Sequence, residues 1–288
     1  MQIGCANDVD RVAPPAGRHQ RVDGAARIAF TARAGLADLY QRAPCRFLFP
    51  DGPAGDPPQA VSITTSGGLT GGDRLRVELA IGENAAATIA TQAAEKLYRA
   101  LPGEADTRID THVSVGPGGW GEWLGQEAIL FDGARVRRGF EAEIAGDARL
   151  LAVESLVFGR GAMGEEYRHG RVHDSWRIRR DGRLVWVDVL RLDGDVAGTM
   201  ALPFGFGEAR ATATIVYAGA DAATHVDLAR GLVPVGVRGG ATCLDRLLIV
   251  RMLSVDPAAL KQAVIRMAGA LRAAAGGWTD RLPAVWTC

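Results

Sequence analysis

The chain has 288 residues and is 48% hydrophobic, which is enough for one large domain or two small ones. Its 33 basic and 33 acidic residues cancel to a formal charge of +0, so no net field favours nucleic acid or an anionic membrane. No stretch approaches the ~18 consecutive apolar residues of a membrane-spanning helix. Cys5, Cys45, Cys243 and Cys288 lie far apart without a CxxC pair, which argues against a disulfide framework and predicts a reducing cytoplasm.

The chain opens with a segment rich in Arg, Pro and Gly, residues 1–26, which we expect to be a loosely ordered lead-in. Its charges are scattered and it has no apolar core, so it is not expected to be a secretory signal. A first strand is predicted from residue 27. The sequence offers no strong linker after that point, and we predict one mostly β domain over residues 27–288.

A glycine-rich loop, SGGLTGGD at residues 66–73, leads into a strand at residues 74–81 that alternates apolar and polar side chains. The loop contains Gly67, Gly68, Gly71 and Gly72. A phosphate-binding loop would need a lysine and a following helix, and this sequence has a strand instead. The simpler interpretation is a tight turn that Asp73 caps with its side chain.

A drifting repeat follows the loop. Alternating strands end in tight turns at Gly82, Gly116 and Gly146, and each turn leads to a second strand and a polar kink. Strand-sized units at a nearly regular period predict stacked β coils, a two-layer β-structure resembling a β-helix or solenoid. An ordinary β-sandwich would produce similar strands and remains the alternative.

The later part of the chain predicts a hairpin and a few helices. Asp181 and Gly182 form a turn between strands at residues 176–180 and 184–192. A short helix is possible at residues 222–230. A longer one is predicted at about 257–275, where Asp256 can cap the N-terminus and an apolar stripe follows one face: Leu260, Val264, Met267 and Leu271.

Two acids interrupt strands that are apolar on both faces, namely Glu154 and Asp188. Such strands are usually buried on both sides, and an uncompensated carboxylate there costs several kcal/mol. Each acid must therefore pair with an arginine or face water in an internal cavity. The second possibility predicts a polar conduit lined by Asp73, Glu154 and Asp188, whose few oxygen ligands would hold a divalent cation only weakly.

Signs of catalysis are weak. His169 and His173 have the spacing of a helical metal site, but Gly170 argues against a helix there. No GxSxG elbow and no cysteine nucleophile signature occur. We therefore predict no catalytic residues, and the residues alone give only weak support to an enzymatic function.

Several motifs occur in a specific order: the loop at 66–73, KLYR at 96–99, QEAILF at 126–131, LVFGR at 156–160 with MGE at 163–165, and DRLL at 245–248. Taken together over roughly residues 27–286, they resemble the UreD (UreH) family of urease accessory proteins. Thr70 stands where that family more often has an apolar residue.

The resemblance implies a non-catalytic cytoplasmic chaperone that helps place nickel in apo-urease. Members bind the helical protein UreF, which recruits the GTPase UreG, so GTP hydrolysis would belong to a partner. They have a β-helix-like fold and are thought to pass Ni²⁺ through an internal tunnel, with no tightly bound cofactor. The matching tunnel positions are Asp73, Glu154 and Asp188.

Two other functions remain open. A hydrolase on a β-solenoid would need a carboxylate cluster in an open groove, and a nickel store would need His or Cys clusters that the sequence lacks. If the chain is a scaffold, its arginine-rich surfaces and the helix carrying Leu260–Leu271 are candidate docking surfaces for protein partners.

Overall fold

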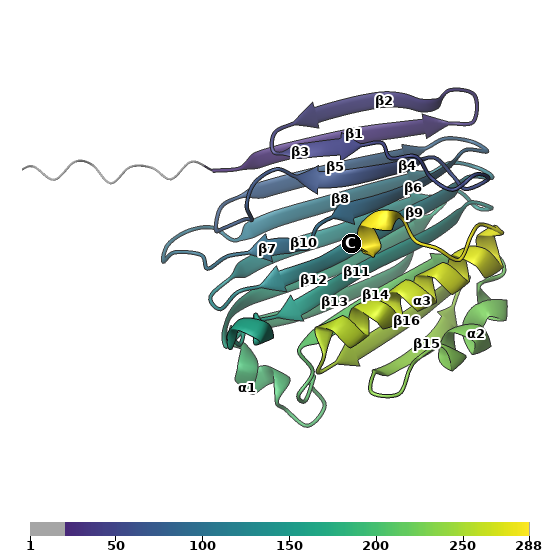
Figure 1. Ribbon diagram of the computed structural model, residues 1–288. Helices are drawn as coiled ribbons and strands as arrows, with labels where there is room; N and C mark the ends of the chain where they lie inside the picture. The colour runs from purple at the N-terminus through teal and green to yellow at the C-terminus, as the bar shows by residue number, and fades with distance from the viewer. Residues whose placement is uncertain (1–20, 288) are drawn as a thin grey trace, which may run out of the picture.

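The computed structural model describes residues 21–287, which fold into two facing β-sheets with one long helix against the second (Figure 1). Sheet A has seven strands, in the spatial order β13 (Arg183–Asp195), β12 (His169–Arg180), β10 (Arg135–Ile144), β8 (Thr107–Val115), β5 (Arg74–Ile81), β1 (Asp23–Thr31) and β2 (Gly35–Arg42). Sheet B has nine, in the order β15 (Arg238–Leu244), β16 (Leu247–Ser254), β14 (Ala211–Ala218), β11 (Arg149–Phe158), β9 (Trp120–Leu130), β6 (Ala86–Gln92), β4 (Gln59–Thr64) and β3 (Cys45–Leu48), with β7 (Glu95–Leu97) also paired to β9.

The centre of both sheets is built from coils. The chain passes from β5 to β6, from β8 to β9 and from β10 to β11, so each coil contributes one strand to sheet A and one to sheet B. Successive strands pair in parallel, and Ile81, Val115 and Ile144 lie in one register immediately before the repeating turns. A Cβ atom at Gly116 would lie 3.0 Å from the backbone nitrogen of Glu83, which explains the glycine at this close approach. The predicted two-layer, solenoid-like structure is confirmed.

Antiparallel strands complete the ends of the coils. The hairpin of β1 and β2 extends sheet A at one edge, and the hairpin of β12 and β13 extends it at the other. The latter is the hairpin that the sequence predicted, and its turn at Asp181 and Gly182 has positive φ at both residues. β14, β16 and β15 extend sheet B in antiparallel fashion.

The main core lies between the sheets and follows from the alternation of the strands. In β5, Leu75, Val77, Leu79 and Ile81 are all buried, as the pattern predicts. Their neighbours Arg74 and Arg76 point outward and are exposed. Burying each such aliphatic side chain stabilises the fold by about 1.5–3 kcal/mol.

Helices are few: α1 (Val196–Met200), α2 (Val226–Gly231) and α3 (Pro257–Gly276), with short 3₁₀ turns at Gly161–Met163, Ala222–His225 and Ala284–Trp286. The predicted C-terminal helix is confirmed as α3. Asp256 accepts a 2.8 Å hydrogen bond from the Ala258 amide, and Gly277 ends the helix with φ of 71°.

The outer face of sheet B is covered by α3, which lies on β11, β14 and β16 (Figure 1). The apolar stripe from Leu260 to Leu271 is buried in this second core. The helix was predicted as a candidate docking surface for a partner, and its apolar stripe is not available for that role because sheet B covers it. Docking of a partner on α3 stays a prediction. Only the opposite face of the helix remains exposed.

A buried charge network fixes the C-terminal end of α3. The Arg272 side chain is fully buried, and its Nε donates to both carboxylate oxygens of Glu122 on β9 at 3.0 Å. Its Nη1 donates to Asp56 at 2.8 Å in the loop before β4. Arg272 thus ties the helix, sheet B and a loop more than 200 residues distant in sequence.

The N-terminal part of the structure begins earlier than predicted. β1 starts at Asp23, inside the segment expected to be loosely ordered, because residues 23–30 pair in register with β5. Residues 1–20 of that predicted lead-in lie outside the described residues. Among the helices of residues 21–287, none is long and apolar enough to cross a membrane.

Candidate functional site

The glycine-rich loop is a capped turn. One Asp73 oxygen accepts a 2.8 Å hydrogen bond from the Thr70 amide, and the other accepts one of 2.8 Å from the Val22 amide. The side chain is buried. Gly68 has φ of +138°, and a Cβ there would lie 2.4 Å from the Tyr98 ring, so the loop packs tightly on the following segment. Of the two roles that the sequence left open for Asp73, the structure confirms the cap.

Glu154 lies on the inner face of β11, between the two sheets. Two consecutive residues of β9, Gly125 and Gln126, stand opposite it because the register of β9 and β11 shifts there. The shift is a β-bulge, and Trp123, which precedes it on β9, faces the interior beside the acid. The indole nitrogen of Trp123 donates to Glu154 at 3.1 Å.

Arg138 on β10 meets Glu154 from the opposite sheet. Its Nε lies 2.9 Å from Glu154 Oε2, and both side chains are almost fully buried. The same guanidinium donates two hydrogen bonds of 2.8 Å to the carboxylate of Asp174, which stands directly beside it on β12. The three charges therefore form a triad of one base and two acids inside the protein.

Burial and ion pairing both act on the pKa values of Glu154 and Arg138. Desolvation raises the pKa of Glu154 and outweighs the opposing attraction of Arg138. For Arg138, desolvation acts to lower the pKa, but the charges of Asp174 and Glu154 outweigh it and raise the pKa above its usual value. Arg138 is thus cationic at all physiological pH values.

Two cavities meet at this triad. An inner cavity of about 80 Å³ lies between the sheets and is lined by Arg138 and Glu154 together with Thr91, Glu95 and Gln126. An outer cavity of about 230 Å³ is lined by Arg138 and Glu154 together with Asp174, Asp188 and Arg251. Glu154 Oε2 is buried and has no hydrogen-bond partner among the described residues, although it forms the ion pair with Arg138.

Asp188 lies at the outer cavity. It sits on β13, and its carboxylate pairs at 2.7 Å with Arg251 of β16, which belongs to the other sheet. The Asp188 side chain is 29% exposed to solvent. Glu154 and Asp188 each have an arginine partner, which is the first predicted alternative, and each also lines a cavity. The conduit stays a prediction.

Asp73 is separate from this pair. It lines neither the inner nor the outer cavity, and its two oxygens accept hydrogen bonds from the amides of Thr70 in the turn and Val22 before β1. The structure therefore brings together two of the three acids that the sequence singled out.

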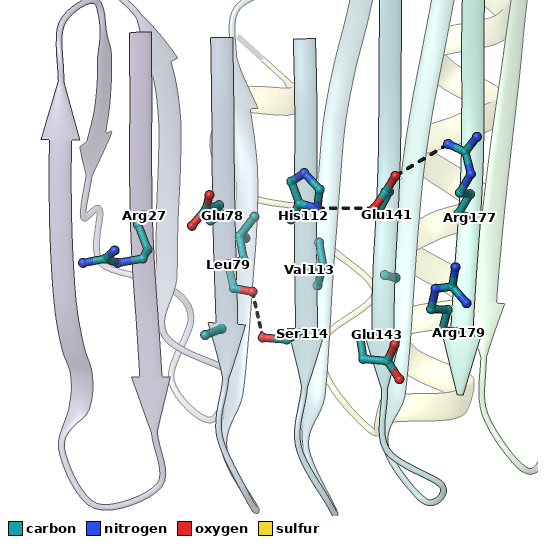
Figure 2. A pocket seen from close by; sticks show the side chains of 12 residues that line it. Arg27, Glu78, Leu79, His112, Val113, Ser114, Glu141, Glu143, Arg177 and Arg179 are labelled. Atoms are coloured by element: carbon teal, nitrogen blue, oxygen red, sulfur yellow. Dashed lines mark hydrogen bonds and ion pairs between the residues drawn. The ribbon is translucent and has the colours of Figure 1, made fainter. Parts of the chain in front are cut away.

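An open groove of about 370 Å³ lies on the outer face of sheet A and holds His112, Glu78, Glu141 and Glu143 (Figure 2). Glu141 pairs with Arg177 at 3.5 Å and lies 3.7 Å from His112 Nδ1. These are solvated pairs between neighbouring strands, and they do not resemble the enclosed triad.

No His, Cys, Asp and Glu side chains of residues 21–287 form a group of three that could hold a metal ion. His169 and His173 both lie on β12. Four residues of extended strand span about 13 Å, so one ion cannot bind both. A helical metal site at this pair is therefore ruled out.

Comparison with known proteins decides the family. The family described as UreD urease accessory protein matches residues 22–287. The chain is 41% identical over 279 residues to the urease accessory protein UreD of a Methylobacterium species, covering 93% of this chain and 96% of that protein. The corresponding Magnetococcus marinus protein is 40% identical over 276 residues, covering 93% and 94%. The chain belongs to the UreD family.

The UreD family match extends over both sheets and α3, so it includes the triad and both cavities. Sequence reasoning missed Arg138 and Asp174 in this UreD family member. A signal was present, because each occupies an inward position in a strand whose other inward residues are mostly apolar, Arg180 at the end of β12 being the exception. In β10 these are Val136, Phe140, Ala142 and Ile144, and in β12 they are Val172, Trp176 and Ile178.

Proposed function

We propose that this UreD family member is a non-catalytic urease maturation chaperone that passes Ni²⁺ through its interior. In this proposal it acts in the cytoplasm as a scaffold in a complex with UreF and UreG, and the complex docks on apo-urease. Membership of a family of urease accessory proteins supports the role in maturation. Nickel is the cargo, and no cofactor is tightly bound.

The observation that carries the nickel proposal is the position of Glu154. Its carboxylate lines both cavities, and one of its oxygens is buried without a hydrogen bond. Arg138 offsets the charge of this oxygen, and a cation in either cavity would compete with the guanidinium for it. When both carboxylates are ionised, the triad has two negative charges and one positive charge, which favours a cation over an anion there.

The ion pairs around Glu154 suit transient contact. Arg138 keeps two hydrogen bonds to Asp174 when Glu154 turns to a cation, so its charge stays paired. A divalent ion would first meet Asp188 at the outer cavity in competition with Arg251, and then Glu154. Few carboxylate ligands in competition with arginines hold a divalent ion weakly, as transfer requires.

Glu95 extends the acidic path beyond the triad. It lines the inner cavity with Glu154, and burial raises its pKa while a hydrogen bond from Thr64 partly opposes this. Asp73 has a different part in the proposal. It shapes the loop formed by Gly67, Gly68, Gly71 and Gly72, and it contacts nickel only if the turn opens.

The test is co-expression of this chain with urease subunits, UreF and UreG, followed by pull-down, urease activity and nickel analysis. We expect Glu154→Gln and Asp188→Asn to lower urease nickel content while the complex still assembles. Glu141→Gln is the matched control, since it removes one carboxylate from the outer face of sheet A. Full activation by the Glu154→Gln, Asp188→Asn double variant would refute passage through these cavities, and absence of co-purification would refute the scaffold.

A further inference from the structure

The outer face of sheet A carries rows of side chains that run across the strands. One row, the mixed row, consists of Arg27, Glu78, His112, Glu141 and Arg177, which stand opposite one another on five neighbouring strands (Figure 2). Its acids alternate with basic or neutral side chains. Opposite charges on neighbouring strands stabilise a sheet, so the mixed row is what stability alone would favour.

A second row on the same face is mostly positive, and on β1 it ends at Asp23, which stands opposite Arg74. This arginine row consists of Arg74, Arg108, Arg137, His173 and Arg191 on β5, β8, β10, β12 and β13. The four arginines are exposed to solvent. Like charges that stand directly opposite each other destabilise a sheet, so this row costs the fold stability that the mixed row does not.

The arginine row is only partly neutralised. Arg108 pairs with Asp110 at 2.7 Å, and Arg191 approaches Asp193 at 3.7 Å. Within residues 21–287, no ion pair joins Arg74 or Arg137 to an acid. Arg76, which follows on the same face of β5, likewise has none there. This excess of positive charge contrasts with the zero net charge of the whole chain.

We propose that the arginine row is a docking site for an acidic helix of a partner protein, which lies across the strands. Neighbouring strands are about 4.8 Å apart, so the row spans about 19 Å. Residues three or four apart on a helix are about 5–6 Å apart, so a helix with acids at that spacing offers about one carboxylate per strand. About 13 helical residues cover the row.

The shape and charge of the site favour a protein helix over nucleic acid or phosphate. The arginines are spread along a line on a flat sheet and do not converge on one point, as a phosphate would require. Nucleic-acid-binding domains are usually strongly basic, whereas this chain has a pI near 7.0. The proposal is independent of nickel passage, because the row lies on the outer face, away from the triad.

The test measures binding of the full chain to a labelled alanine-based helical peptide of about 20 residues with glutamate at every third or fourth position. Fluorescence anisotropy is recorded at low and at physiological salt for the wild type. The Arg74→Gln, Arg137→Gln double variant removes two charges from the arginine row. The Arg27→Gln, Arg177→Gln double variant removes two charges from the mixed row of the same face and is the matched control.

We expect the arginine-row variant to bind about three- to tenfold more weakly, since each exposed ionic contact contributes modestly. The control is expected to bind like the wild type, and added salt should weaken binding. The melting temperature supplies a second readout. It should rise in the arginine-row variant, where repulsion is relieved, and fall or stay constant in the control, which loses the ion pairs of Arg27 with Asp38 and of Arg177 with Glu141.

If both double variants lose the same affinity, binding depends only on net charge and the proposal is wrong. Absence of peptide binding by the wild type would also overturn it. Inorganic polyphosphate serves as a competitor. If it binds more tightly than the peptide through the same arginines, the row is a phosphate site and the helix proposal is wrong. None of these outcomes bears on Glu154, so nickel passage would stand or fall separately.

Discussion

Arg138 and Glu154 join the two sheets at the centre of the protein, with the guanidinium Nε 2.9 Å from the carboxylate. The arginine belongs to sheet A and the acid to sheet B, and both are more than nine-tenths buried. Since both cavities are lined by this pair, the same contact bears on stability and on the proposed passage of nickel.

Replacing Arg138 by methionine should destabilise the protein strongly. The change leaves Glu154 and Asp174 buried without their cation, and breaking a buried pair in this way costs about 3–5 kcal/mol. Urea denaturation measures the free energy of unfolding. Arg177→Met, which removes only an exposed partner of Glu141, should cost less than about 1 kcal/mol. Similar losses for the two variants would contradict the buried triad.

The stability that Glu154 contributes should depend on pH in a defined direction. Burial raises its pKa in the folded state, so the folded protein holds the proton more tightly than the unfolded chain. The stability of the wild type relative to Glu154→Gln is therefore greatest below the ordinary carboxyl pKa of about 4.3. This relative stability should fall as the pH rises from there through the raised pKa of Glu154 in the folded protein. Melting temperatures of both proteins across this range test the sign, and a relative gain with rising pH would contradict it.

Arg272→Met should loosen α3 and the segments tied to it. The substitution leaves Glu122 buried without its cation and removes the contact with Asp56, at an expected cost of about 3–5 kcal/mol. Hydrogen exchange should show faster exchange in the second half of α3. Arg266→Met, at an exposed position of the same helix, is the control and should change stability by less than about 0.5 kcal/mol. Unchanged exchange in the Arg272 variant would show that the apolar stripe alone fixes the helix.

Asp73→Ala should weaken the fold without a selective effect on nickel transfer. It leaves the partly buried amides of Thr70 and Val22 without their acceptors, which we expect to cost about 1–2 kcal/mol. Asp73→Asn keeps one acceptor oxygen and should cost less. Nickel content of urease per assembled complex is the deciding measurement. If Asp73→Ala lowers the nickel content as much as Glu154→Gln does, with the complex intact, Asp73 takes part in the passage of nickel and this prediction is wrong.

Much of the fold was determined by local sequence pattern. The alternation from Leu75 to Ile81 predicts a strand and its buried face, because a strand has a period of two whatever it pairs with. The turns at Gly82, Gly116 and Gly146 predict coils, since short turns recur where strands of equal length stack. Asp256 and Pro257 predict the start of α3 because capping depends on neighbouring residues only.

Tertiary structure alone decided the partners of the acids. The sequence marks Glu154 and Asp188 as polar residues in apolar strands, but it does not determine which arginine faces each of them. That depends on sheet pairing between segments far apart in the chain and on the bulge at Gly125 and Gln126, which shifts every side chain beyond it by one position. The arginine row has the same origin. In the sequence, each arginine is an ordinary exposed residue of its own strand. The arginines form a line only because the register of the paired strands places them side by side.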